Sequence, residues 1–182
     1  MPRQRWADIS QRITDRAIRD SQIRDATVVH CYWPLLDKRE LDTRPLIRAL
    51  LDANKRVALP VVTNFESVAS DTPAPEPRMH QIELEPTTVL LPNQWNVWEP
   101  AGGQQVPFDA IDLVIVPGLC ADAQGYRVGY GKGYYDELLK LTDATSLCLL
   151  PTYALTESIP HEAHDAPLDI ILTESRRLTP HR

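Results

Sequence analysis

The residues best suited to chemistry lie close together between positions 125 and 136. Four of the seven glycines and four of the six tyrosines fall there. Glycines let backbone N–H groups approach an anion, and a helix that starts after such a loop adds a partial positive charge. Arg127 can bind two phosphate oxygens, Lys132 can neutralise a transferring group, and Asp136 can hold the magnesium that accompanies a nucleotide. The stretch therefore predicts a phosphate cradle.

A glycine-rich turn that only links a strand to a helix is the simpler alternative, and it is the usual meaning of a bare G-x-G-x-G. The two cations and the carboxylate beside these glycines favour phosphate binding. The spacing is not that of a Walker A loop, which needs G-x-x-x-x-G-K followed by Ser or Thr. It is also not the dinucleotide fingerprint, which closes directly into a helix.

Five short apolar runs predict buried strands that position this loop. They cover residues 28–32, 57–62, 113–116, 146–150 and 168–172. Their length and branched side chains are typical of strands covered on both faces. A helix between the first two runs makes a strand–helix–strand unit, which requires parallel pairing.

Three amphipathic helices are expected around the strands, since apolar residues recur at helical spacing. The sets are Trp6, Ile9, Ile13 and Ala17; Leu46, Ile47, Leu50 and Leu51; and Tyr134, Leu138 and Leu141. Asp42 or Thr43 can cap the second helix, and Asn54 suits its C-terminal end. The chain is expected to form a single α/β domain over residues 1–182, a three-layer α/β/α sandwich with a mostly parallel sheet. Ligands should bind beyond the carboxyl ends of its strands.

The segment from Thr63 to Pro107 is rich in proline and has weak periodicity. Residues 79–85 are expected to form an edge strand or a hairpin arm, whereas Trp95 and Trp98 are expected in a loop. A loop of this length inside a compact domain is usually functional or mobile.

With these residues in place, a family resemblance becomes specific. The stretch Arg127-Val-Gly-Tyr-Gly-Lys-Gly-Tyr-Tyr-Asp136, preceded by Val-Pro-Gly at 116–118, resembles the 5-formyltetrahydrofolate cyclo-ligase family. Other pieces are similar to that family and occur in the same order: Glu40-Leu-Asp-Thr43, Leu59-Pro60, Leu91-Pro92, Trp95-Asn96-Val97, Pro100, His164-Asp165 and Asp169-Ile-Ile. The resemblance covers roughly residues 7 to 175.

The resemblance implies an ATP- and Mg²⁺-dependent ligase that closes 5-formyltetrahydrofolate to 5,10-methenyltetrahydrofolate. ATP would be bound by Arg127, Val128, Gly129, Tyr130, Gly131, Lys132, Gly133, Tyr134 and Tyr135, with Lys132 and Arg127 catalytic. Folate would be bound by Glu40, Tyr134 and Trp95. Asp136 and Asp165 would hold the metal, with Asp169 as a weaker alternative. In the family reaction the formyl oxygen attacks the γ-phosphate, N10 attacks the activated carbon, and phosphate leaves, so no protein nucleophile is needed.

The chain departs from the family pattern at its beginning. Family members carry an N-terminal helix with a Lys-x-x-x-Arg arrangement that contacts ATP, whereas here only Arg3 and Arg5 precede Trp6 and neither is expected in such a helix. The connection from Tyr32 to Glu40 is also longer than usual. Three explanations of this departure remain open. They are a late start codon, an enzyme with weaker ATP binding, and a diverged relative that binds folate or nucleotide without turnover. A phosphate-ester enzyme on the same fold is a further alternative.

Composition excludes several other classes. The formal charge of −6 argues against a nucleic-acid partner, and no apolar stretch approaches the roughly 20 residues that span a bilayer. The first residues do not resemble a signal peptide, and three widely spaced cysteines suit free thiols in a reducing compartment. We expect a cytoplasmic protein without a membrane partner, and a monomer is favoured. His161 and His164 lack a third strong ligand nearby, which argues against zinc.

Overall fold

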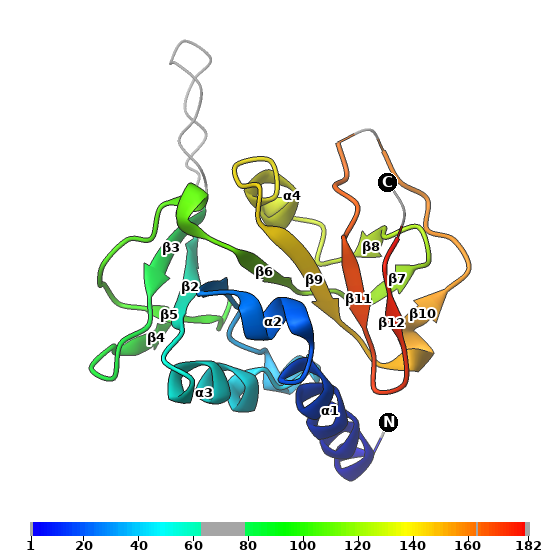
Figure 1. Ribbon diagram of the computed structural model, residues 1–182, viewed down its shortest axis with the longest axis horizontal. Coiled ribbons are helices and arrows are strands. Elements are labelled where there is room, and N and C mark those ends of the chain that lie inside the picture. The colour runs from blue at the N-terminus through cyan, green and yellow to red at the C-terminus, as the bar shows by residue number, and fades with distance from the viewer. Residues whose placement is uncertain (1, 63–78, 163, 181–182) are drawn as a thin grey trace.

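The computed structural model describes residues 2–62, 79–162 and 164–180. Its centre is a seven-stranded sheet in the order β12-β11-β9-β6-β1-β2-β3 (Figure 1). Strands β2, β1, β6, β9 and β11 run parallel to one another, whereas β3 and β12 pair antiparallel at the two edges. The bounds are β1 Val28–His30, β2 Arg56–Val62, β3 Met79–Glu83, β6 Leu113–Val116, β9 Thr145–Leu149, β11 Ile170–Leu172 and β12 Arg177–Leu178.

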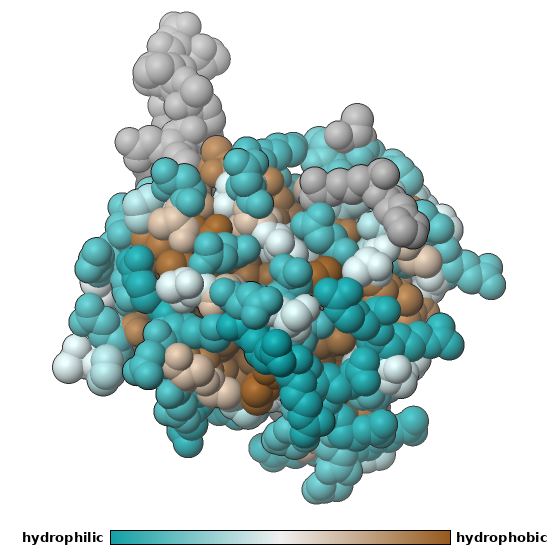
Figure 2. Space-filling model, viewed as in Figure 1, coloured by the Kyte–Doolittle hydropathy of each residue, from teal (hydrophilic) through white to brown (hydrophobic). Residues whose placement is uncertain are grey.

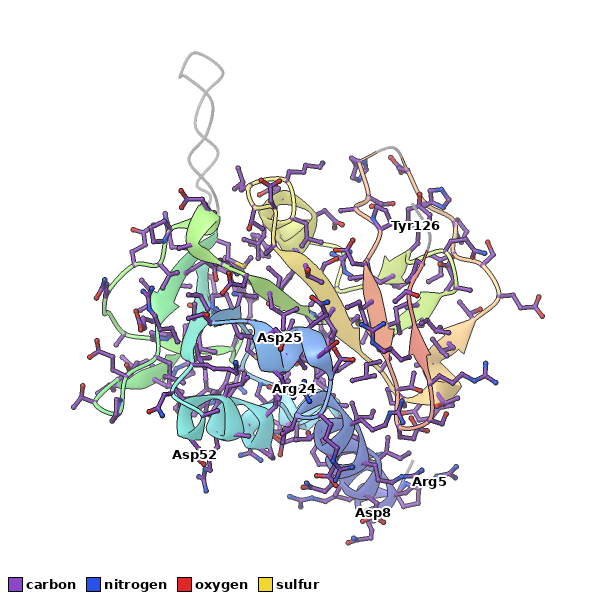
Figure 3. All side chains as sticks on the ribbon, viewed as in Figure 1. Arg5, Asp8, Arg24, Asp25, Asp52 and Tyr126 are labelled. Atoms are coloured by element: carbon purple, nitrogen blue, oxygen red, sulfur yellow. The ribbon has the colours of Figure 1, made fainter. Side chains whose placement is uncertain are left out.

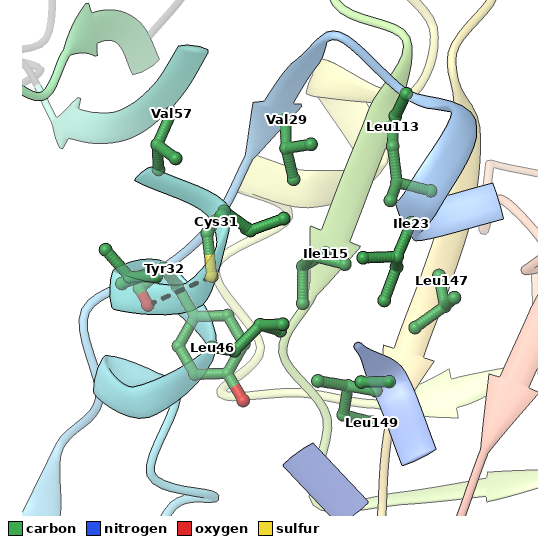
Figure 4. Packing of buried hydrophobic residues seen from close by; sticks show 14 of the residues in the cluster. Ile23, Val29, Cys31, Tyr32, Leu46, Val57, Leu113, Ile115, Leu147 and Leu149 are labelled. Atoms are coloured by element: carbon green, nitrogen blue, oxygen red, sulfur yellow. Dashed lines mark hydrogen bonds between the residues drawn. The ribbon is translucent and has the colours of Figure 1, made fainter. Parts of the chain in front are cut away.

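Alternate residues of the parallel strands pack into two separate cores. Val29, Leu113 and Leu147 face the helices α1 (Arg3–Ala17), α2 (Ser21–Asp25) and α3 (Arg44–Asp52), as the close-up of this core shows (Figure 4). Their neighbours Val28, Val114 and Cys148 belong to the core on the opposite face, which α4 (Tyr134–Leu138) joins through Leu138. The uninterrupted apolar runs of the sequence thus reflect burial on both faces.

The expected α/β architecture with a mostly parallel sheet is confirmed. The five predicted strands are all present, with ends that differ by no more than two residues. Strand β11 begins later than expected because Leu168 N–H donates to the Gly125 carbonyl and Asp169 N–H to Ser146 Oγ. Residues 79–83 form the edge strand β3, paired with β2.

The helix after the glycine-rich loop is shorter than the sequence suggests. It ends at Leu138, and Leu141, predicted on its apolar face, is 45% exposed. That prediction is wrong because only six residues separate Leu138 from β9, so the chain has to turn back toward the sheet at once.

Two smaller sheets arise where the sequence indicates only loops. One joins β7 (Cys120–Asp122), β8 (Arg127–Val128) and β10 (Leu155–Thr156); the other is the hairpin of β4 (Leu90–Pro92) and β5 (Trp98–Pro100). Trp98 is therefore a strand residue, and its placement in a loop is wrong. Three 3₁₀ turns complete the described elements: η1 Leu36–Lys38, η2 Phe108–Ala110 and η3 Thr152–Ala154. Residues 63–78 of the proline-rich segment lie outside the described residues.

The first helix begins earlier than expected. It starts at Arg3 and includes Arg5, both of which precede Trp6, the first residue of the predicted apolar set. The side chains of Arg5 and Asp8 point from α1 away from the sheet (Figure 3). The molecular face over α1 to α3 is largely hydrophilic (Figure 2). Among the described residues, no helix is both long and apolar enough to cross a membrane.

Candidate functional site

The topology of the sheet creates a place for a ligand between β1 and β6. The chain leaves β1 toward β2 on one side, and it leaves β6 toward β9 on the other side. In open α/β sheets, ligands bind where the strand order reverses in this way, beyond the carboxyl ends of the strands. The segment with Glu40 follows β1, and the glycine-rich loop follows β6 by way of β7 and β8. Both predicted ligand-binding segments therefore start at this point.

The glycines of the loop differ in what surrounds them. A Cβ added at Gly125 would lie 2.8 Å from the carbonyl oxygen of Leu168, so this glycine permits close packing. A Cβ added at Gly129 or Gly131 would meet no described atom within 4 Å. Gly131 has φ +72°, a conformation that favours glycine, whereas neither strain nor packing accounts for Gly129. The middle of the loop is therefore open, as a phosphate cradle has to be.

Arg127 is held inside the protein at the beginning of this loop. Only 6% of its side chain is exposed. One guanidinium nitrogen, Nη2, lies 3.2 Å from Asp136 Oδ1, and Nη1 donates to the Ala166 carbonyl at 3.2 Å. The Ala166 N–H also donates to Asp136 Oδ1, at 3.3 Å. If both nitrogens are to bind a phosphate, these bonds have to break.

Glu40 occupies a partly buried position close to the same loop. Its Oε2 accepts the Leu35 N–H at 2.7 Å, which closes the long connection after β1 around the turn η1. The Tyr130 hydroxyl donates to the same carboxylate. Burial raises the pKa of Glu40, an effect that the bonds from Leu35 and Tyr130 and the nearby Lys38 oppose.

Tyr130 thereby connects the glycine-rich loop to the Glu40 segment. Burial, followed by the charge of Glu40, raises the pKa of Tyr130 to about 12, so its hydroxyl keeps its proton. The Lys38 ammonium lies 4.7 Å from the centre of its ring. From the other side, Trp6 Nε1 on α1 donates to the carbonyls of Arg39 (3.1 Å) and Glu40 (3.0 Å). Three segments that are distant in sequence therefore meet at Glu40.

Comparison with known proteins places this arrangement in a family. The family model described as the 5-formyltetrahydrofolate cyclo-ligase family matches residues 1–174. The chain belongs to this family. The match starts at residue 1, earlier than the resemblance seen in the sequence.

Individual cyclo-ligases agree with this assignment. The 5-formyltetrahydrofolate cyclo-ligase of Escherichia coli (strain K12) is 30% identical over 142 residues, which cover 75% of this chain and 73% of that protein. Its counterpart in Haemophilus influenzae is 29% identical over 167 residues, covering 89% and 83%. The structure of a 5,10-methenyltetrahydrofolate synthetase from Aquifex aeolicus superposes with a TM-score of 0.80 at 24% identity, covering 100% of this chain and 86% of that one.

The other residues predicted for a cyclo-ligase site lie on several elements. Lys132 is exposed in the open part of the loop, and Tyr134 begins α4 with a half-buried ring that packs against the second core. Trp95 is 43% exposed in the turn between β4 and β5, where its N–H donates to Asn93 Oδ1. Trp95 thus belongs to a different element from the other predicted ligands.

The segments that carry the two carboxylates predicted to bind magnesium in the cyclo-ligase contact each other at Ala166. Asp136 accepts the Ala166 N–H, and Asp165 is the residue before it. Asp165 Oδ2 accepts the Glu162 N–H at 2.7 Å. In the described part of the chain, no three His, Cys, Asp or Glu side chains gather to hold a metal. Asp169, the weaker alternative, accepts hydrogen bonds from the N–H and the hydroxyl of Ser146 at the amino end of β9.

Sequence reasoning missed the contacts that Trp6 and Tyr130 make with Glu40 in this cyclo-ligase site. Trp6 is counted only as a core residue of the first helix, and Tyr130 only as part of the loop. His30 is interpreted as a satisfied core or sheet-end histidine, and the structure confirms that it is buried and hydrogen-bonded. The signal for His30 was present, because it is a polar residue inside an otherwise apolar strand.

Proposed function

We propose that the protein closes 5-formyltetrahydrofolate to 5,10-methenyltetrahydrofolate with consumption of ATP. In a chain of the cyclo-ligase family, the observation that carries this proposal is the contact of Tyr130 with Glu40. It brings the glycine-rich loop, suited to phosphates, beside a carboxylate suited to the pterin. Phosphoryl transfer requires the nucleotide and the folate to lie side by side in this way.

The reaction itself makes limited demands on the protein. The formyl oxygen on N5 has to attack the terminal phosphorus, and ADP leaves. N10 then attacks the formyl carbon and gives up its proton to the departing phosphate, the C–O bond breaks, and inorganic phosphate carries the oxygen away. Each step exchanges one nucleophile for one leaving group, so positioning and neutralisation of charge are the main contributions.

We assign these tasks to residues as follows. Backbone N–H groups from Gly129 to Gly133 hold the phosphates in the open part of the loop, and Lys132 compensates the charge on the transferring group. Glu40 accepts hydrogen bonds from the pterin. Tyr134 borders the folate near the formyl group, and Trp95 covers it from the β4–β5 turn. Arg127 binds phosphate after exchanging its bond with Asp136.

Magnesium fits the residues present. It is usually bound by one or two carboxylates together with substrate phosphates, so Asp136 and Asp165 are sufficient without a third protein ligand. It supplies neutralisation of the phosphate oxygens. Asp136→Asn is expected to raise the magnesium concentration needed for half-maximal activity, and an unchanged magnesium titration would remove Asp136 from this role.

A direct assay tests the proposed function. The purified protein is mixed with 5-formyltetrahydrofolate, ATP and Mg²⁺, and the near-ultraviolet absorbance of the methenyl product is followed. An ATP-dependent increase is expected. Lys132→Ala should lower kcat/KM by about a hundredfold or more, because Lys132 acts on developing charge, and the thermal midpoint should not change. Lys140→Ala, an exposed lysine beyond α4, is the matched control.

The absence of an ATP-dependent increase, combined with measurable binding of 5-formyltetrahydrofolate, would instead support a family member that binds without turnover. Equal losses of activity and stability in Lys132→Ala would contradict the role assigned to this lysine.

A further inference from the structure

A chain of three polar side chains crosses the core between the sheet and α4. His30 on β1 is fully buried, and its Nδ1 lies 2.5 Å from Gln81 Oε1 on the edge strand β3. Its Nε2 lies 3.0 Å from the Tyr135 hydroxyl, in the first turn of α4. The rings of His30 and Tyr135 meet edge to face, with centroids 5.5 Å apart and planes at 61°. This chain of polar side chains thus ends at Tyr135, the last of the residues assigned to ATP.

This chain of polar groups lies in an apolar environment. Val28, Ala58 and Val114 surround it in the second core, and Gln81 is fully buried. Gln81 Nε2 is buried without a hydrogen-bond partner among the described residues. A buried polar group without a partner costs stability, whereas apolar residues of similar shape would pack here without that cost. Packing alone therefore does not account for these three residues.

In each hydrogen bond between these three side chains, the donor and the acceptor can be assigned. Burial lowers the pKa of His30 to about 4, so the imidazole is neutral at pH 7. Gln81 Oε1 is an acceptor, so Nδ1 of His30 carries the proton and Nε2 accepts. Tyr135, whose pKa burial raises well above its usual value, then donates its hydroxyl proton to His30. The orientation of the Tyr135 ring and the position of its hydroxyl proton are both fixed from within the sheet.

We propose that His30 and Gln81 are positioning residues for the proposed ligase reaction, which orient Tyr135 and with it the glycine-rich loop and the start of α4. Neither residue lies in the loop itself. They act through Tyr135, which is continuous with Lys132, Tyr134 and Asp136. This inference rests on the proposed function for its kinetic consequence, whereas its structural part can be tested without turnover.

The kinetic test compares His30→Leu, Gln81→Leu and the double variant. His30→Leu is expected to lower kcat roughly tenfold to a hundredfold, because a small displacement of positioned groups has effects of this size. The KM for 5-formyltetrahydrofolate should stay within about twofold, since neither residue is assigned to folate. The double variant should be no worse than His30→Leu, because Gln81 acts only through His30. His30→Gln, which keeps one donor and one acceptor, should recover part of the loss.

Ser146→Ala is the matched control. Ser146 is also buried and bonded to a neighbouring side chain, but it lies at the amino end of β9, opposite the site. It should lower stability and leave kcat unchanged. If His30→Leu lowers only the thermal midpoint, as Ser146→Ala does, or if the losses in the double variant simply add, the positioning role is wrong.

Two measurements do not depend on turnover. The ¹⁵N shifts of the wild-type histidines should show His30 as a neutral ring protonated on Nδ1, and Tyr135→Phe should move them. A ring protonated on Nε2 would overturn the proton arrangement. A non-hydrolysable ATP analogue should bind His30→Leu more weakly than wild type by calorimetry. If the wild type makes no methenyl product but these two results hold, the proposed function fails and the positioning role survives. If the wild type is active and the variants do not differ from it, the positioning role fails and the proposed function survives.

Discussion

At the scale of single residues, the glycines of the loop provide a contrast between packing and ligand binding. Gly125 has φ +96° and no room for a Cβ beside Leu168. Gly129 has room, and its φ needs no glycine. Gly129→Ala should therefore fold with an unchanged thermal midpoint and raise the KM for ATP, because the methyl group would enter the space assigned to a phosphate.

Gly125→Ala is the counterpart for this measurement. It should lower stability by about 1 kcal/mol or more, since it combines a strained conformation with a clash against backbone. If Gly129→Ala has the same ATP dependence as the wild type, the open part of the loop is not the phosphate site.

Glu40 offers a second test at this scale, because burial raises its pKa. A carboxyl with a raised folded-state pKa stabilises the fold below its unfolded-state pKa, and this contribution is lost as pH rises through the folded-state value. At pH 7 the ionised Glu40 therefore costs stability. Glu40→Gln should match or exceed the wild-type thermal midpoint at pH 7, and its advantage should shrink at pH 4.

The same variant should bind 5-formyltetrahydrofolate about tenfold more weakly or worse, since hydrogen bonds to a charged acceptor contribute more than those to a neutral one. Calorimetric titration with folate measures this loss, with Glu137→Gln on α4 as a control. A variant that is less stable but binds folate normally would assign Glu40 to structure rather than to substrate.

At the scale of elements, the strands were the most predictable part. A run such as residues 113–116 is apolar throughout, because both faces of the central sheet are covered, and its limits agree with β6. The helix after the loop was overestimated because helical spacing at Leu141 does not register the short distance to β9. The pairing of β7, β8 and β10 could not be predicted, since each has only two or three residues and β10 is distant in sequence from its partner β7.

The predictability of the site follows the same division. Lys132, Arg127 and Asp136 stand out because they lie within ten residues of one another and their types are suited to phosphate and its metal. The contacts of Glu40 with Trp6 and Tyr130 depend on how α1 and the loop after β6 approach the end of β1, which local sequence does not encode. The internal bond between Arg127 and Asp136 was likewise invisible, because the sequence does not show that Arg127 is buried.

The buried chain from β3 through β1 to α4 leads to a prediction about pH. The pKa of His30 is about 4 in the fold and 6.5 in the unfolded chain. The unfolded chain therefore binds more protons between these values, and stability falls as pH decreases from about 6.5 toward 4. The loss attributable to His30 should be on the order of 3 kcal/mol. Urea unfolding at pH 7, 5.5 and 4 measures it.

His30→Leu is the reference for this experiment. The unfolding free energy of the wild type minus that of His30→Leu should fall by this amount from pH 7 to pH 4, because leucine does not titrate. Other acidic groups contribute equally to both proteins and cancel. A difference that stays constant from pH 7 to pH 4 would mean that His30 does not remain neutral in the fold.

At the scale of the whole molecule, the reversal of strand order beside β1 brings two chain segments to one place. The segment after β1 contains Glu40, and the segment after β6 contains the glycine-rich loop. Tyr130 links them directly, because its hydroxyl donates to Glu40 while Lys38 lies against its ring. A nucleotide that moves the loop must change this link, and a folate that takes the Glu40 carboxylate must change it as well.

Binding of the two substrates should therefore be coupled through Tyr130. Coupling between two ligands is reciprocal, so each should change the affinity of the other by the same factor, typically about fivefold or more. The measurement is calorimetric titration with 5-formyltetrahydrofolate, with and without a non-hydrolysable ATP analogue. Tyr130→Phe removes the hydroxyl but keeps the ring beside Lys38. The factor by which one ligand changes the affinity of the other should therefore fall toward one, while each ligand still binds. Tyr153→Phe, an exposed tyrosine on η3, should keep the wild-type factor. If Tyr130→Phe keeps it too, the link between the two segments is only a packing contact, and their proximity alone supports the reaction.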